Sequence, residues 1–191
     1  MTKRLLACFA VIVAALAVSP AAAVPQTAET FTATATIKTV AAGASATAPV
    51  RIALDRKMPQ SEADKYSAAF KTGGAAALRK ALAGVAPVGS VTLGAAKPVP
   101  VRIAFERAAG GGRLITIVTD TPLLFVGASL PGAKAKEGYE FGVIDLEVDA
   151  QGNGSGTVSP AAKIGLNPQG AFVVTDYSQE LVRLTNVARA K

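Results

Sequence analysis

Residues 99–120, VPVRIAFERAAGGGRLITIVTD, predict a β-hairpin around which the rest of the fold can be arranged. The first half alternates apolar residues with polar or small ones, as expected for a strand with one buried face: Val99, Val101, Ile103 and Phe105. Three glycines at 110–112 accept the positive φ that a tight reversal needs. The return run at 114–118 is apolar on both faces, which favours a buried strand. We therefore expect this hairpin in the middle of a sheet.

Similar strand patterns occur on both sides of the hairpin. They cover residues 31–37, 50–55, 88–93, 141–149, 157–164, 171–175 and 181–187. Short turns join most of these strands, which favours antiparallel pairing. Pro160 cannot donate a ladder hydrogen bond, so the strand that contains it is expected at an edge. Residues 24–29 are expected to form a loose lead before the first strand.

One segment, residues 61–84, has helical periodicity instead. Ser61 and the carboxylate three residues later resemble a capping box, with Ser61 as the N-cap. An apolar stripe recurs at helical spacing: Tyr66, Phe70, Leu78 and Leu82. Gly73-Gly74 interrupts the pattern, and Gly84 suits a helix end. We expect two short helices, or one kinked helix, that pack this stripe on the sheet as a plug or a lid.

These elements together predict an α+β fold that is mainly antiparallel. The expected architecture is a sandwich or a barrel of about nine strands, with one helical hairpin inserted near the N-terminus.

The first 23 residues have the pattern of an export signal. A short basic region precedes an apolar run at 5–18, and three alanines at 21–23 provide a cleavage site. The apolar run is shorter than the roughly 20 residues that a transmembrane helix needs. We expect a signal peptide at 1–23 and a single exported domain at 24–191, in the periplasm or secreted.

The composition excludes several kinds of chemistry. The chain has no histidine or tryptophan, and its one cysteine, Cys8, lies in the predicted signal peptide. The expected mature chain therefore has no disulfide, no Ser-His-Asp or Cys-His catalytic set and no usual zinc site. The formal net charge is +7, but the cations are scattered, as on a solvated surface. We expect no cofactor and no nucleic-acid partner, no transmembrane segment after cleavage, and a monomer.

Polar groups at the ends of predicted elements are candidates for a binding site: Asp120, Thr121, Tyr139, Asp176 and Tyr177. The sequence does not show whether these residues meet. A second candidate is the turn after the strand at 141–149. Asp149, Gln151 and Asn153 occupy the first, third and fifth positions of a calcium-loop pattern, but the twelfth is Pro160 instead of a glutamate. We therefore expect a β-turn there, and no metal site.

Three carboxylates, Asp145, Glu147 and Asp149, recur at a spacing of two residues on one predicted strand face. They could serve acid–base chemistry, or form a solvent face that pairs with basic residues such as Lys163 or Arg183. We favour the solvent face.

Three classes of function remain open. The favoured one is a non-catalytic exported binding or structural domain of the bacterial cell envelope, because catalytic motifs are missing. The second is a hydrolase with a carboxylate pair drawn from Asp120, Asp145, Glu147, Asp149 and Asp176. The third is a surface protein that binds an anionic polymer or membrane.

Several segments also occur in an order that resembles an uncharacterised family of exported bacterial proteins. They are FKTGGAAALRKAL (70–82), PVGSV (87–91), GGRLITIVTDTPLLF (111–125), FGVIDLEVDAQGNGSGTVSPAAKI (141–164) and VRLTNV (182–187). The resemblance implies one exported domain and transfers no activity or residue role.

Overall fold

The computed structural model describes residues 28–38, 45–123, 138–167, 172–176 and 182–190. The predicted signal peptide, Cys8 and Tyr177 lie outside these ranges. The described elements, in chain order, are β1 (Glu29–Lys38), β2 (Ser45–Leu54), α1 (Gln60–Ala83), β3 (Gly89–Leu93), β4 (Val99–Ala109), β5 (Gly112–Thr119), β6 (Phe141–Val148), β7 (Gly154–Leu166), β8 (Phe172–Asp176) and β9 (Val182–Arg189).

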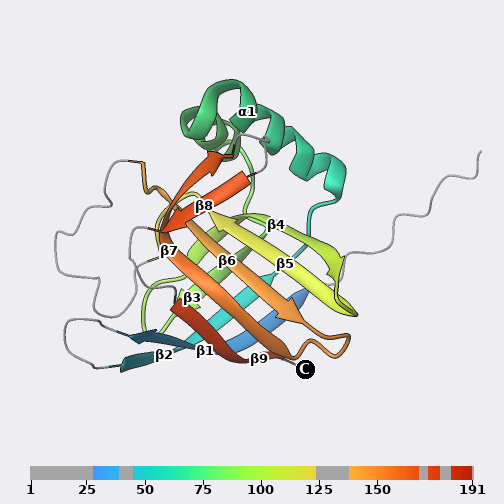
Figure 1. Ribbon diagram of the computed structural model, residues 1–191, viewed down its shortest axis with the longest axis vertical. Helices are drawn as coiled ribbons and strands as arrows, with labels where there is room; N and C mark the ends of the chain where they lie inside the picture. The colour runs from blue at the N-terminus through green and yellow to red at the C-terminus, as the bar shows by residue number, and fades with distance from the viewer. Residues whose placement is uncertain (1–27, 39–44, 124–137, 168–171, 177–181, 191) are drawn as a thin grey trace, which may run out of the picture.

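The nine described strands form one antiparallel sheet, in the order β6-β5-β4-β3-β2-β1-β9-β7-β8. An additional pairing between β6 and β7 closes eight of them into a barrel and leaves β8 outside it (Figure 1). The prediction of a mainly antiparallel domain with about nine strands is confirmed. The sheet closes into a barrel, so the sandwich alternative is not found.

β7 is the strand that joins the barrel to β8. One of its edges pairs with β6, while the other pairs first with β9, at 154–158, and then with β8, at 162–166. Pro160 lies between these two stretches and within an irregularity of the β6 pairing. Its missing N–H therefore interrupts no regular ladder. The prediction that Pro160 marks an edge strand is wrong, because the strand has partners on both sides.

The barrel interior is filled with apolar side chains. Strand pairing places neighbouring inward residues in rows across the sheet, and one such row contains Ile115, Leu146, Gly156 and Leu184. A Cβ added to Gly156 would clash with the backbone oxygen of Asp145 and lie 2.9 Å from Leu146 Cδ2, so there is no space for a side chain at this position. The interior is thus a packed core.

A bulge in β4 changes which residues face the barrel interior, although the sequence predicted one regular alternation along the whole strand. The pairing with β5 shifts between Val101 and Ile103. Val101 therefore faces the interior, whereas Ile103 and Phe105 face outward and Ala104 faces inward. The prediction of a single apolar face for this strand is wrong, because the extra residue in the bulge inverts the alternation.

The β4–β5 turn follows the prediction. Gly110 and Gly111 have φ of 53° and 84°, a conformation that residues with a Cβ rarely adopt. β5 is apolar on both faces, as expected: Ile115 and Ile117 fill the interior, while Val118 is buried on the outside.

α1 consists of two helical stretches joined at a kink, where Gly73 and Gly74 have non-helical φ and ψ, in agreement with the predicted interruption at this glycine pair. The kink arises because Gly74 has φ 65° and ψ −157°, a combination available essentially to glycine alone. The helix begins one residue before Ser61, so the predicted capping box is wrong. The N-cap is Pro59, whose carbonyl oxygen accepts hydrogen bonds from the N–H groups of Glu62 and Ala63. The N–H of Gly84 donates to Leu82 at the other end.

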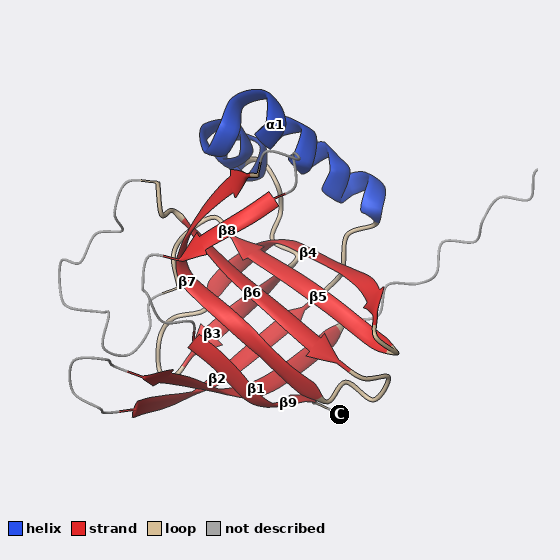
Figure 2. Cartoon of the chain, in the orientation of Figure 1, coloured by secondary structure: helices blue, strands red, loops and turns tan. Residues whose placement is uncertain are grey.

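α1 lies between β2 and β3 in the chain and crosses one end of the barrel (Figure 2). Its buried side chains are Phe70, Leu78 and Leu82, and Tyr66 packs partly against the same core. α1 is therefore anchored on both sides of its kink. Among the described residues, no helix has the length and apolar character needed to cross a membrane.

Replacing Leu78 by alanine tests this packing. Leu78 is 4% exposed, so its truncation should lower the free energy of unfolding by about 2–5 kcal/mol. Lys80→Ala, at an exposed position of the same helical half, should change it by less than about 0.5 kcal/mol. Denaturant unfolding of both variants measures the difference. Equal stabilities would show that the helix does not pack as described.

Candidate functional site

One cleft is a groove of about 350 Å³ between α1 and the outer face of the barrel. Its apolar lining comes from the helix, from the barrel wall and from β8: Ala63, Tyr66, Leu78, Ile103, Phe105, Val118, Val143, Ile164 and Val174. Polar groups lie at Gln60, Asp64, Ser67, Arg107 and Thr116. We call this cleft the outer groove. It has the apolar lining and few polar groups that are typical of ligand pockets.

The bulge in β4 is what provides the barrel side of the outer groove. It turns Ile103 and Phe105 outward, where they line the groove beside Val118 of β5. Ile103 and Val118 are each only 7% exposed although they face outward, and side chains of α1 line the same groove. The groove is thus a gap between two apolar surfaces that are otherwise in contact.

The polar groups of the outer groove differ in their hydrogen-bond and ion-pair partners. The Thr116 hydroxyl donates a hydrogen bond to Asp145 Oδ1 at 2.6 Å, and the Gln60 amide donates to Asp64 Oδ1 at 2.8 Å. Arg107 is exposed and forms no ion pair with a described carboxylate. The charged groups that line this groove are therefore the guanidinium of Arg107 and the exposed carboxylate of Asp64.

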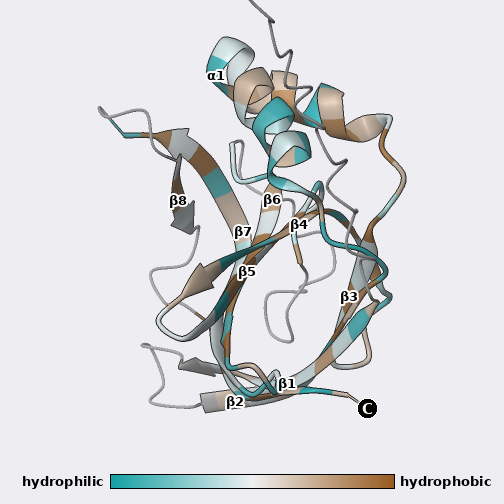
Figure 3. Ribbon diagram, turned by 90° about the vertical axis from the view of Figure 1, so that its right-hand side faces the viewer, coloured by the Kyte–Doolittle hydropathy of each residue, from teal (hydrophilic) through white to brown (hydrophobic). Residues whose placement is uncertain are grey.

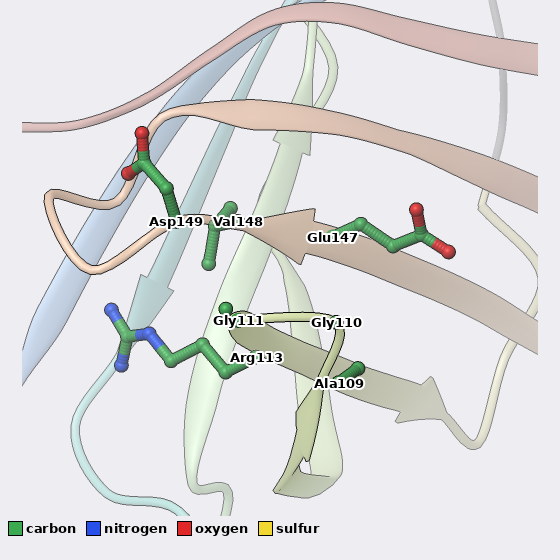
Figure 4. A pocket seen from close by; sticks show the side chains of 8 residues that line it. Ala109, Gly110, Gly111, Arg113, Glu147, Val148 and Asp149 are labelled. Carbon is green, nitrogen blue, oxygen red and sulfur yellow. The ribbon is translucent and has the colours of Figure 1, made fainter.

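A second cleft, of about 460 Å³, lies between the β4–β5 and β6–β7 turns (Figure 4). Its lining includes Gly110, Gly111, Arg113, Glu147 and Asp149. Figure 4 shows the carboxylates of Glu147 and Asp149 pointing in different directions, away from each other. The cleft therefore presents no pair of carboxylates across a substrate-sized gap.

An ion-pair network centred on the buried carboxylate of Glu29 lies beside this second cleft. Arg113 donates to both carboxylate oxygens of Glu29, at 2.7 and 3.0 Å, and Lys57 Nζ lies 2.8 Å away. Arg189 lies 3.3 Å from the same carboxylate. Glu106 accepts hydrogen bonds from Lys57 at 2.7 Å and from Arg113 at 3.0 Å. The network links β1, β4, β5 and β9 with the segment after β2.

The environment of Glu29 shifts its ionisation strongly. Burial disfavours the charged carboxylate, but the hydrogen bonds and charges of Arg113 and Lys57 outweigh it and lower its pKa from 4.5 to about 2. The guanidinium of Arg113 lies 6.0 Å from the Phe31 ring centroid, at the limit of a cation–π contact. With its hydrogen bonds all directed within the network, Glu29 has a structural role.

The binding residues expected at element ends fall at one end of the sheet. Asp120 and Thr121 follow β5, and Tyr139 precedes β6, which pairs with β5 through Thr119 and Gly142. Asp120 forms an ion pair with Arg102 at 2.9 Å. The backbone of Asp176 lies opposite Ala162 of β7, but its side chain and Tyr177 are outside the described residues. Of these residues, Asp120, Thr121 and Tyr139 have described side chains, and none of the three lines either cleft described above.

The calcium-like turn is satisfied by its own backbone. Asp149 Oδ1 accepts the N–H groups of Gln151 and Asn153, at 2.9 and 2.8 Å, and these bonds help to lower the Asp149 pKa, Asn153 first. The expected β-turn is therefore present. Within the described ranges, no group of three or more acidic, histidine or cysteine residues could hold a metal ion.

Asp145 and Glu147 lie on the outer face of β6, as predicted, opposite the inward Ile144 and Leu146. Their expected basic partners are not found among the described ion pairs. Asp145 instead accepts the hydroxyl of Thr116 on the neighbouring strand, and Arg183 pairs with Thr157, one strand beyond.

Sequence reasoning missed Glu29 and the barrel side of the outer groove. Residues 24–29 were expected to be a loose lead, yet Glu29 begins β1 and is 8% exposed. Extending the alternation of Phe31 and Ala33 backwards would have placed Glu29 on the inward face. The outward turn of Ile103 had no comparable signal, because a bulge leaves no mark in an apolar run.

Comparison with known proteins identifies no relative whose function could be compared with this geometry. No protein-family model, curated protein or solved structure matches the chain. The functional argument therefore depends on the two clefts and their residues.

The pH dependence of stability tests the Glu29 network. Since its pKa is lowered on folding, its ionised form stabilises the fold above pH 4.5, and this stabilisation is lost as pH falls towards 2. The shift corresponds to about 3 kcal/mol. Glu29→Gln should be destabilised at pH 7, and its difference from the unaltered protein should shrink between pH 5 and 2. Urea unfolding across this range measures the gap.

Glu147→Gln provides the control, because Glu147 is exposed and outside the network. Its stability should follow that of the unaltered protein at every pH. A gap for Glu29→Gln that stays constant down to pH 2 would contradict the assignment of the shift to this carboxylate.

Proposed function

We propose that this protein is a non-catalytic, exported binding domain of the bacterial cell envelope, and that it holds an apolar group of its ligand in the outer groove. The observation that carries the proposal is the groove itself, a cleft of about 350 Å³ with an apolar lining and a charged rim. This volume falls in the usual range for sites that bind small molecules or the side chains of a partner.

The barrel interior is an unsuitable place for a ligand in the described structure. Eight-stranded barrels can hold one small ligand when their interior is left open. Here large side chains from several strands, such as Phe31, Ile52, Ile115 and Leu146, fill the interior and are fully buried. An apolar ligand therefore has better access to the outer groove than to the centre of the barrel.

The alternative of a carboxylate-dependent hydrolase receives no support from the described carboxylates. Asp120 is paired with Arg102, Asp149 is held in its turn, and Asp145 is bonded to Thr116. Glu147 is exposed and points away from Asp149 (Figure 4). A general acid and base need to face each other across the substrate.

Binding to an anionic polymer is also less well supported. Six of the described basic side chains are in ion pairs with carboxylates: Arg56, Lys57, Arg79, Arg102, Arg113 and Arg189. Their charge is therefore partly neutralised within the protein. The export and envelope location in the proposal come from the signal-peptide pattern at 1–23.

Filling the outer groove tests the proposal. Ala63 lines the groove, so Ala63→Phe should occupy its volume and weaken binding of the apolar fluorophore 8-anilinonaphthalene-1-sulfonate by at least about tenfold. Fluorescence titration of the folded protein measures the affinity. Native mass spectrometry of protein purified from the cell envelope should, in parallel, show a bound ligand that this variant loses.

Ala68→Phe is the matched control. Ala68 is an exposed alanine in the same half of α1 and does not line the groove, so this variant should bind the fluorophore like the unaltered protein. Equal binding by the two phenylalanine variants would refute the outer groove as the site.

A further inference from the structure

We propose that the ligand is an extended polypeptide segment that pairs with β8 as an added strand and inserts alternate apolar side chains into the outer groove. This inference rests on the proposed function, and it names the class of partner. Four features of the described structure carry it: an unpaired strand edge, exposed apolar residues beside that edge, continuity of the edge with the groove, and a nearby free cation.

β8 is the one described strand that has a neighbouring strand on one side only. Each of the other eight strands has a neighbour on both sides, because the sheet closes between β6 and β7. β8 pairs with β7 alone, and Figure 3 shows it standing away from the barrel wall. An unpaired edge presents a row of N–H and C=O groups that another extended chain can satisfy. We call the paired residues 162–166 of β7 and 172–176 of β8 the ribbon, and the free backbone groups at its edge select for a polypeptide.

The exposed large apolar residues of the described structure are all on this ribbon. Leu166, Val173 and Val174 are 38%, 39% and 44% exposed. Proteins usually protect a strand edge with charged residues, proline or a covering segment. An edge that carries valines instead is suited to contact with another chain.

The ribbon and the outer groove share one face. Val174 pairs with Ile164 of β7, and both side chains line the groove. Side chains along a strand alternate between its two faces. A strand added beside β8 would therefore direct every second side chain to the groove, next to Val174, and the others to the opposite face. This is how strand addition combines affinity from the main chain with specificity from pockets.

The opposite face of the ribbon favours an acidic residue in the partner. Lys163 of β7 lies beside Thr175 of β8, is exposed, and has no ion pair with a described carboxylate. The added strand would lie two strand spacings from β7, about 10 Å, which the length of a lysine side chain helps to bridge. We therefore infer a partner segment with apolar residues on one face and acidic residues on the other.

A synthetic peptide with this pattern tests the inference. The probe is Thr-Val-Glu-Val-Glu-Val-Thr with blocked termini, and a peptide of the same composition with its three valines together is the control. The isotope-labelled protein is titrated with each peptide and followed by nuclear magnetic resonance. The probe, but not the control peptide, should shift the backbone amide resonances of 172–176. Half of these amides should also become protected from hydrogen exchange, because alternate N–H groups face the free edge.

N-methylation of the probe separates strand addition from simple insertion into the groove. One derivative is methylated on its valine nitrogens and the other on its glutamate nitrogens, so only one of them removes the N–H groups that face β8. We expect one derivative to bind at least about tenfold more weakly than the probe, and the other to bind equally well. Equal binding by both derivatives would overturn strand addition.

The outcomes for the two proposals are distinguishable. If Ala63→Phe abolishes fluorophore binding but no peptide binds to the unaltered protein, strand addition is wrong and the proposed function stands. If Ala63→Phe changes the affinity for neither the fluorophore nor the peptide, both the proposed function and strand addition are wrong. Sedimentation equilibrium could instead show that the free protein is a dimer, with the amides of 172–176 protected from hydrogen exchange. This result would assign the edge of β8 to a second copy of the chain and overturn the peptide proposal.

Discussion

Closure of the sheet between β6 and β7 is the constraint on which the rest of the structure depends. The pairing of Phe141–Val148 with residues 154–162 turns an open sheet with two long edges into a barrel. Closure divides the side chains of every strand into an inner and an outer set. Because the inner set is large and apolar, it fills the barrel. The apolar residues of the outer set then need another cover, and α1 provides it.

The length of β7 connects this closure to the proposed binding surface. Residues 154–158 pair with β9 and belong to the barrel wall, whereas residues 162–166 extend beyond it and pair with β8. The bulge near Pro160 separates the two parts. The outer groove is lined by residues of this extension, of the barrel wall and of α1. The groove and the open edge of β8 therefore have a common structural origin.

The Glu29 network shows that ion pairs, as well as apolar packing, connect the segments of the fold. Desolvation of a buried ion pair offsets much of its attraction, so a pair of this kind adds little stability compared with apolar packing. Its geometry is nevertheless specific, because Glu29 has to meet Arg113, Lys57 and Arg189 at once. These residues come from segments far apart in the chain, so the network fixes how those segments align. Losing a basic partner would leave the charge of the buried Glu29 carboxylate less well compensated.

The sequence by itself determined the local elements, because strand and helix patterns depend on neighbouring residues. The alternation at 31–37, the three glycines at 110–112 and the helical stripe around Leu78 all led to elements that the structure contains. The glycine pair in α1 was likewise readable, since the need for a positive φ at Gly74 is a local property. The absence of histidine, and the presence of a single cysteine at position 8, also limited the catalytic and metal-binding chemistry that the sequence allows.

Tertiary structure decided the barrel closure, the bulge in β4 and every part of the candidate site. A one-residue bulge inverts the faces of a strand without changing its composition, so the outward position of Ile103 and Phe105 could not be derived from their spacing. The partners of Glu29 are 28 to 160 residues away in the chain, and no local pattern relates them. The outer groove depends likewise on contacts between α1, β4, β5, β7 and β8, because a cleft exists only where distant segments approach each other without filling the space between them.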